Sequence, residues 1–190
     1  YRIFSKEEML NRIKLISKVY GEKIWLNIGV IEAEDLELFK PYVKGIVSSI
    51  ETIEPKLHDK ICPDKPIQPY EEMFEKTKDF QKSMTMVIGL GEKKEDFSLL
   101  KEFITKHKLE RITFYALKPV KGTPFENTNG PKTEDYLWWI AQTRIHFPKL
   151  EIIAGTTARR YEEVGLLIKA GANAFTKFPA TKMFGTKEAY

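Results

Sequence analysis

The sequence has 190 residues, of which 42% are hydrophobic and 31% charged, a composition typical of one globular domain with a sizeable core. The formal net charge is +4, but the lysines alternate with acidic residues along predicted helices, which disfavours a nucleic-acid-binding surface. No apolar run is long enough to cross a membrane and no secretory signal is visible, so we expect a cytoplasmic protein with neither nucleic acid nor membrane partners.

The chain contains a single cysteine, Cys62. One thiol excludes a disulfide framework, a zinc site or an iron–sulfur site made within this chain, and we predict an inert thiol; the alternative is one ligand of a shared cluster. Lysine, glutamate and isoleucine are abundant, which suits a thermophile. The histidines lack metal-ligand spacing and are predicted to be surface or packing residues: His58, His107 and His146.

Helical and strand patterns alternate along the chain. A capping box at residues 5–8 predicts a first helix, which Gly21 is placed to end. Short apolar segments predict six buried strands over residues 24–30, 45–50, 84–88, 111–117, 150–154 and 172–178. Between them, helices are predicted around residues 36–39, from Pro69, and over 97–107, 133–146 and 158–169.

This alternation predicts an α/β fold with a parallel sheet, either open or part of a (β/α) barrel of about eight units. In both cases ligands bind at the carboxyl ends of the strands. The residues at the predicted strand ends are therefore the candidate site residues: Asn27, Ser49, Glu51, Gly89, Gly91, Glu92, Ala116, Leu117, Lys118, Gly155, Thr156, Arg159 and Lys177.

Three of these strand ends allow two interpretations each. Gly89 and Gly91 could let backbone amides approach a flat or anionic ligand, but a turn that needs positive φ explains them better from local sequence. Glu51 could bind an amine or hydroxyls of a ligand, or cap the next turn. Arg159 or Arg160 could clamp a carboxylate, and only one of the two adjacent side chains can face the site.

Several of these segments together resemble the biotin synthase group of radical S-adenosylmethionine (SAM) enzymes, which includes hydrogenase-maturation and methylornithine synthase enzymes. The matching segments follow in order over residues 24–178: SIET at 49–52, VIGLGE at 87–92, VKGTP at 120–124, then residues 144–145, 154–155 and AGAN at 170–173. The resemblance implies strands three to eight of a SAM-binding barrel. Residues 1–190 would then be a single partial radical SAM barrel domain, the C-terminal portion of a longer chain.

The resemblance also implies a role for individual residues. Glu51 and Ser49 would contact the methionine or ribose part of SAM, with Glu92 supporting the glycine turn. The residues expected along the adenine or ribose are Val87, Ile88, Gly89, Ala116 and Leu117. The residues expected to contact substrate are Asn27, Thr156 and Arg159.

Two departures from the group are informative. The CxxxCxxC loop that holds the [4Fe–4S] cluster is absent, so that cluster would be bound by residues upstream of this chain. The positions of the [2Fe–2S] ligands of biotin synthase read Trp25, Ser83 and Thr156, so an auxiliary cluster of that type cannot form, although another type can. The nearest subgroup is that of archaeal biotin-synthase-related proteins, which includes lipoyl synthase components.

The implied activity is formation of a 5′-deoxyadenosyl radical for hydrogen abstraction, with sulfur insertion as in lipoyl synthase as one version. The implied partners are a small-molecule or carrier-protein-bound substrate and a second radical SAM subunit, and the 190-residue chain alone is expected to be inactive. Two alternatives remain open. One is a barrel lyase with Lys118 or Lys177 as base or Schiff-base amine, and the other is a cluster-less SAM-binding or interaction scaffold.

Overall fold

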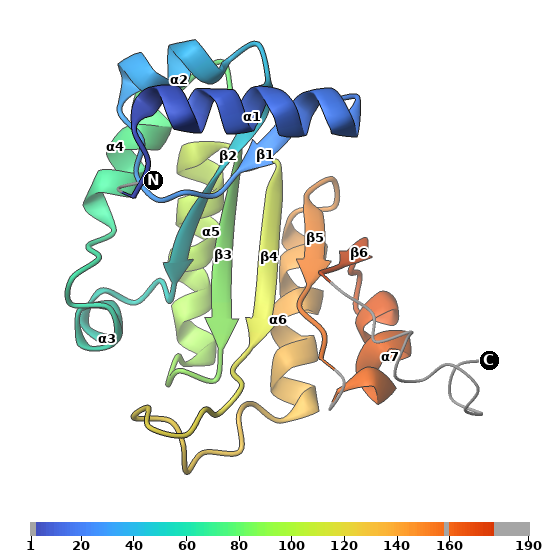
Figure 1. The fold of residues 1–190 in the computed structure, drawn as a ribbon. Coiled ribbons are helices and arrows are strands. Elements are labelled where there is room, and N and C mark those ends of the chain that lie inside the picture. Colours follow the sequence, from blue (N-terminus) through green and yellow to red (C-terminus); the bar gives the residue numbers. More distant parts are fainter. Residues whose placement is uncertain (1–2, 158–159, 177–190) are drawn as a thin grey trace.

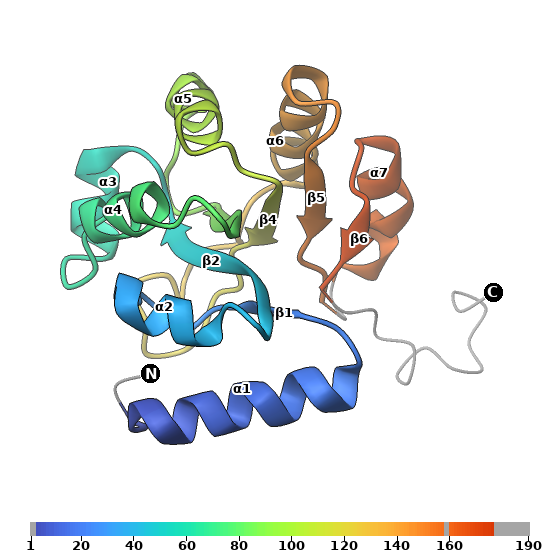
Figure 2. The same ribbon diagram turned by 90° about the horizontal axis from the view of Figure 1, so that it is seen from above.

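The computed structural model describes residues 3–157 and 160–176. Within these residues, six parallel strands form one sheet in the order β1 to β6, so each strand pairs with its neighbours in sequence. The strands are β1 (Ile24–Leu26), β2 (Val43–Glu51), β3 (Gln81–Ile88), β4 (Arg111–Ala116), β5 (Glu151–Ala154) and β6 (Ala174–Phe175). The sheet curves into half of a barrel (Figures 1 and 2), which confirms the predicted α/β partial barrel.

The helices lie outside the curve of the sheet, as Figure 2 shows for α5, α6 and α7. Their bounds are α1 (Lys6–Tyr20), α2 (Ala33–Phe39), α3 (Pro55–Ile61), α4 (Gln68–Lys76), α5 (Phe97–His107), α6 (Thr133–His146) and α7 (Val164–Lys169), with 3₁₀ turns at Lys94–Asp96 and Tyr161–Glu163. The predicted capping box of α1 is present, because Ser5 Oγ accepts from Glu8 N and the Glu8 carboxylate accepts from Ser5 N. The bounds of α5 and α6 agree with the prediction.

The two faces of the sheet differ in polarity. Alternate residues of the strands point to the helices and form the core, with no measurable exposure: Ile46, Ile50, Met84, Met86, Ile88, Ile112, Phe114, Ile152 and Ala154. The residues between them point to the concave inner face, where Ser49, Thr85 and Thr113 lie side by side in register across three strands. The inner face therefore carries a row of hydroxyl groups, with apolar side chains at Val47, Val87 and Ile153 around it.

Three predicted segments are corrected. The strand predicted over 24–30 ends at Leu26, and Gly29 after it has a φ of +88° that an extended strand does not allow. Within residues 172–176 the predicted strand is β6, Ala174–Phe175, and within residues 160–169 the predicted helix is a 3₁₀ turn at Tyr161–Glu163 followed by α7. Arg159 and Lys177 lie outside the described residues.

One helix, α3, was not predicted from the sequence. Pro55 occupies its first turn, and the Glu54 carboxylate accepts hydrogen bonds from the amides of Lys56 and Leu57. Across the described ranges, every helix is too short or too polar to cross a membrane.

Candidate functional site at the carboxyl ends of the strands

Strand β2 ends in an unusual backbone turn at Glu51. This residue has a φ of +68°, and the amide of Thr52 donates to the carbonyl of Ile50 at 2.9 Å, which closes a three-residue turn. The pairing register with β3 shifts at the same point, between Ser49 and Glu51. A positive φ is costly for a residue with a side chain, and such strain is concentrated at functional sites.

The Glu51 carboxylate is paired with Lys65 at 2.8 Å, and both side chains are about one-quarter to one-third exposed. A turn in which Lys65 N donates to Cys62 O brings the lysine back to the strand end. His58, which is 2% exposed, holds this turn, because its ring nitrogens lie 3.0 Å from Thr52 O and 2.7 Å from Lys65 O. His58 is thus a packing residue, as predicted, and Lys65 is a neighbour of Glu51 that the sequence did not reveal.

Two further predicted residues lie beside this turn. Ser49 Oγ donates to Asn27 Oδ1 at 3.2 Å, which joins the end of β2 to the segment that follows β1. The structure therefore brings Asn27, Ser49 and Glu51 to the same strand ends. Together they present a carboxylate, an amide and a hydroxyl, a set that can bind the hydroxyls or the amine of a polar ligand.

The Gly89–Glu92 turn does not offer free amides. The Glu92 carboxylate accepts from the amides of Gly89, Leu90 and Gly91 at 2.7, 2.9 and 3.1 Å. Gly89 and Gly91 have φ values of +106° and +120°, so they form the turn with positive φ, and the amides of this turn bind a carboxylate of the chain itself. Burial raises the pKa of Glu92, although the three amides act against that shift.

The loop after β4 folds back over the ends of β3 and β4 (Figure 1). A Cβ at Gly130 would lie 2.5 Å from Leu117 O, and one at Gly89 would lie 2.8 Å from Pro131. Leu117 N donates to Ile88 O at 2.8 Å, and the Ile88 side chain is fully buried among the helix-facing core residues. Val87 and Ala116 are half-buried beside this loop, so the predicted adenine-lining segments do lie next to each other.

At the end of β5, an arginine binds a carboxylate of the chain itself. Arg160 pairs with Glu163 at 2.7 Å and donates to Pro131 O at 2.9 Å, so it holds the loop that covers the strand ends. Thr156 is 2% exposed. The hydroxyl of Tyr136 lies 3.1 Å from Gly155 O, and burial raises the pKa of this phenol.

On the inner face, an arginine and a tryptophan lie deeper than the strand ends. The Arg111 guanidinium lies 3.6 Å from the centre of the Trp25 ring, and its Nε donates to Ser83 Oγ at 3.2 Å. A Cβ at Gly45 would lie 2.4 Å from the Trp25 ring, so only glycine lets the indole lie against β2. Trp25 and Ser83, two positions where biotin synthase has cluster ligands, are therefore linked through Arg111.

Among residues 3–157 and 160–176, no three His, Cys, Asp or Glu side chains are grouped so that they could hold a metal ion. Cys62 is partly buried, and burial raises the pKa of its thiol. A thiol with a raised pKa is a poor thiolate ligand and a poor nucleophile.

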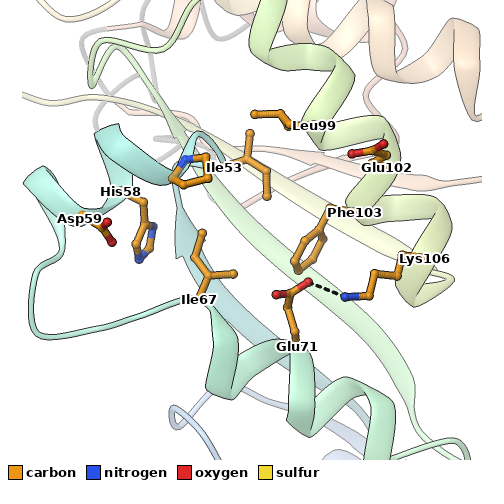
Figure 3. A pocket seen from close by; sticks show the side chains of 10 residues that line it. Ile53, His58, Asp59, Ile67, Glu71, Leu99, Glu102, Phe103 and Lys106 are labelled. Carbon is orange, nitrogen blue, oxygen red and sulfur yellow. Dashed lines mark hydrogen bonds and ion pairs between the residues drawn. The ribbon is translucent and has the colours of Figure 1, made fainter.

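A separate groove of about 570 Å³ lies outside the sheet, between α3, α4 and α5 (Figure 3). Apolar side chains such as Ile53, Ile67 and Phe103 line it, and the Glu71–Lys106 ion pair of 2.9 Å lies at its edge. His58, which holds the turn beside Glu51, also lines this groove, and sequence patterns did not indicate it.

Comparisons with known proteins agree with this geometry. Residues 113–178 match the Biotin and Thiamin Synthesis associated domain. The chain is 36% identical over 189 residues to an uncharacterized protein of Methanocaldococcus jannaschii, covering 98% of this chain and 52% of the relative. It is 26% identical to the 7,8-didemethyl-8-hydroxy-5-deazariboflavin synthase of Archaeoglobus fulgidus, covering 88% and 54%. It is also 34% identical over 108 residues to the biotin synthase of Ehrlichia canis, covering 54% and 32%.

Solved structures share the fold at low sequence identity. Methylornithine synthase superposes with a TM-score of 0.79 at 18% identity, over 89% of this chain and 51% of that one. The FeFe-hydrogenase maturase of Carboxydothermus hydrogenoformans gives 0.69 at 18% identity, over 90% and 44%. The chain thus spans about half the length of the archaeal relatives it matches, and the predicted resemblance to the biotin synthase group is confirmed.

Proposed function

We propose, on the premise that this chain is a biotin synthase-like protein of the radical SAM type, that it forms the part of an enzyme that binds SAM and encloses the substrate. The observation that carries the proposal is the strained turn at Glu51, with Ser49 and Asn27 beside it, at the strand edge that also carries the Gly89 turn. Strain of this kind is retained where it positions a functional side chain.

The described residues fit SAM but not the cluster that goes with it. Glu51 offers a carboxylate for the amine or ribose hydroxyls, the half-buried Val87 offers an apolar side chain for the adenine ring, and Ala116 and Leu117 offer backbone beside it. An iron–sulfur cluster takes several cysteine thiolates, whereas this sequence has one cysteine. Residues outside the printed sequence would therefore hold the [4Fe–4S] cluster.

When bound, SAM and the cluster would supply reductive cleavage to methionine and a 5′-deoxyadenosyl radical, which abstracts a substrate hydrogen. The residues of this chain would orient SAM and exclude water. Glu51, which Lys65 neutralises in this structure, would exchange that lysine for the ammonium or hydroxyls of SAM. The loop held by Arg160 at Pro131 would cover the strand ends and keep the site dry.

The finer predictions remain proposals of lower rank. Sulfur insertion of the lipoyl synthase kind would draw on an auxiliary cluster with its own cysteines, and a carrier-bound substrate or a second subunit has no observation of its own.

The lyase alternative requires a lysine of lowered pKa at the strand ends. Of the lysines in the described ranges, Lys82 has a pKa that burial lowers, and it lies at the opposite end of β3.

The test uses the complete natural gene product, purified without oxygen. Its iron and sulfide contents are measured first, then SAM binding by equilibrium dialysis, and then formation of 5′-deoxyadenosine from SAM with dithionite. We expect about four irons or more per chain, and deoxyadenosine as a product. Glu51→Gln should weaken SAM binding about tenfold, because a charge-assisted hydrogen bond is lost.

The matched control is Glu37→Gln, an exposed glutamate on α2 that is remote from the strand ends and should leave SAM affinity unchanged. A product that neither binds SAM nor contains iron would contradict the proposal and favour a scaffold. SAM binding without iron would favour the cluster-less SAM-binding alternative.

A further inference from the structure

We propose that Arg111 is the anchor for an oxyanion group, a carboxylate or a phosphate, at one end of the molecule that binds the inner face of the half-barrel. The inference extends the proposed function, because it assigns a chemical class to the substrate of the same barrel. No comparison assigns a role to this residue, and the strand-end rule does not select it, since Arg111 is the first residue of β4.

The guanidinium of Arg111 is half-buried and only partly satisfied. Its Nε donates to Ser83 Oγ and its face covers Trp25, but among the described residues its two terminal nitrogens make no hydrogen bond or ion pair. Glu151, its register neighbour on β5, is exposed and forms no ion pair with it in this part of the chain. The two terminal nitrogens are not among the buried atoms that lack a partner, so they reach solvent at the inner face and are open to an anionic ligand.

The contacts of Arg111 fix its orientation. Trp25 lies against Gly45 on one side and the guanidinium on the other, which prevents the arginine from folding away, and Ser83 holds its Nε. The two terminal nitrogens are thereby presented as a rigid pair of donors. This arrangement matches the two oxygens of a carboxylate or phosphate in bidentate geometry.

The surface between Arg111 and the strand ends carries hydroxyl groups beside apolar side chains such as Ile153, which pairs with Thr113. Ser49, Thr85 and Thr113 form a row of hydroxyls in register, one layer further along the strands from Arg111. Val87 and Tyr115 lie one layer beyond that row, and Glu51 follows Ser49 after the register shift at the end of β2. Four residues of strand separate Arg111 from Tyr115, or roughly 13 Å at about 3.3 Å per residue. An extended acid bound by Arg111 would thus reach the strand ends, where the radical would be formed.

The experiment uses the complete natural protein and asks whether a small oxyanion binds at Arg111. Phenylglyoxal, which modifies uncommitted arginines, is applied with or without glutarate, and modification of Arg111 is followed by peptide mass spectrometry. Glutaramide, the uncharged diamide of similar shape, is the control ligand, and inorganic phosphate is the second anion. At about ten times its Kd, a bound anion should slow modification of Arg111 about tenfold by mass action.

Variants locate the effect. Arg111→Gln should weaken glutarate binding measured by calorimetry about 10- to 100-fold. Arg111→Lys keeps the charge but loses the bidentate pair of donors, so its glutarate affinity should lie between those of the natural protein and Arg111→Gln. Arg12→Gln, on the exposed surface of α1, should bind as the natural protein does. SAM affinity, measured on the same samples, should not change in any of the three variants.

The outcomes separate this inference from the proposed function. Protection by glutarate or by phosphate, but not by glutaramide, supports it and identifies which oxyanion the fork prefers. Equal protection by glutaramide, unchanged binding in Arg111→Gln, or an Arg111 that is unreactive without any anion would overturn it; the last would mean that another part of the protein fills the fork. Anion binding in a protein that does not bind SAM would leave this inference standing and remove the proposed function.

Discussion

Two arginines, Arg144 on α6 and Arg111 on β4, show how differently two regions of the same sheet use one side chain. Arg144 donates to the carbonyls of Phe147, Pro148, Leu150 and Gly171 and to the side chain of Asn173, so every nitrogen of its guanidinium is engaged. Arg111 makes one hydrogen bond and a stacking contact. Arg144 therefore stabilises the fold, whereas the terminal nitrogens of Arg111 are available to bind a ligand.

The difference also explains the order of the C-terminal motifs. A Cβ at Gly171 would lie 2.6 Å from Arg144 Cγ, so the arginine packs directly against this glycine, and Asn173 accepts from Arg144 while its Oδ1 also accepts from Ile152 N. Arg144, Gly171 and Asn173 therefore form one structural unit that joins α6, β5 and the segment before β6. Motifs that the sequence suggested as family markers here have a structural function, not a catalytic one.

The largest expected effect is that of Arg144→Met. The substitution leaves several backbone carbonyls without a charged donor, so we expect the free energy of unfolding to fall by about 3 kcal/mol or more. Urea denaturation followed by circular dichroism measures this. Arg12→Met on the exposed face of α1 is the control, and an equal loss in both variants would contradict the structural role of Arg144.

Gly171→Ala should have the next largest effect. Gly171 has a φ of +109°, and the added methyl group would also overlap Arg144, so we expect a loss of about 2–3 kcal/mol. Gly21→Ala is the matched control, because Gly21 has a φ of +80° but nothing within 4 Å of the added Cβ, and should cost about 1 kcal/mol. Gly171→Ala should therefore have a lower midpoint of urea denaturation than Gly21→Ala. Equal midpoints would show that the Arg144 side chain moves away from the added methyl group without loss of stability.

A moderate effect is expected from pH at His107. Burial lowers the pKa of this imidazole, although Glu71 at 3.2 Å opposes the shift, and the ring packs between Phe74 and Phe103. The unfolded chain therefore takes up a proton below its ordinary value of about 6.5 while the folded chain does not, so stability falls as pH decreases through this value. The slope is at most about 1.4 kcal/mol per pH unit.

His107→Phe removes this titration and should flatten the stability profile between about pH 7 and 5.5, measured by denaturation at each pH. His146→Gln is the control, since His146 is exposed and should leave the slope as it was. A natural slope that persists in His107→Phe would assign the acid sensitivity to another group.

The smallest effect on stability is expected for Arg111→Met, which makes the same chemical change as Arg144→Met. Burial lowers the pKa of Arg111, which means that its charge is held at a cost, and replacement by an apolar side chain should change stability by less than about 1 kcal/mol or raise it. Thermal unfolding of the two methionine variants side by side provides the measurement. A large loss of stability in Arg111→Met would show that both arginines stabilise the fold, which would contradict the difference drawn here between them.

Local signals predicted most of the fold. The capping box and Gly21 set the bounds of α1, and regular apolar spacing set those of α5 and α6. The start of β6 was predicted two residues early, because Ala172 and Asn173 belong to the turn after α7 and pairing with β5 begins at Ala174. α3 was missed because it is one short helix that depends on Pro55 and the cap at Glu54 rather than on periodicity.

The candidate site residues at the strand ends were predicted, because parallel strands end at the same edge of a sheet. Residues that reach the site through strand pairing or through a turn elsewhere in the chain were missed. Asn27, Ser49 and Glu51 were grouped correctly because parallel strands end at one edge. Arg111 lies at the start of its strand, and Lys65 arrives through a turn 14 residues after Glu51, so neither is visible in a local pattern. The alternation of Arg111, Thr113 and Tyr115 along β4 was the available signal for the inner face.

The sequential strand order has a consequence for how the molecule forms. Each strand pairs only with the strand before it and the strand after it, so no pairing waits for a distant part of the chain. Closing the crossover between two successive strands costs less loop entropy than pairing with a strand further along the chain would. During synthesis, each of these strands could join the edge of the sheet together with its helix before the next one is made.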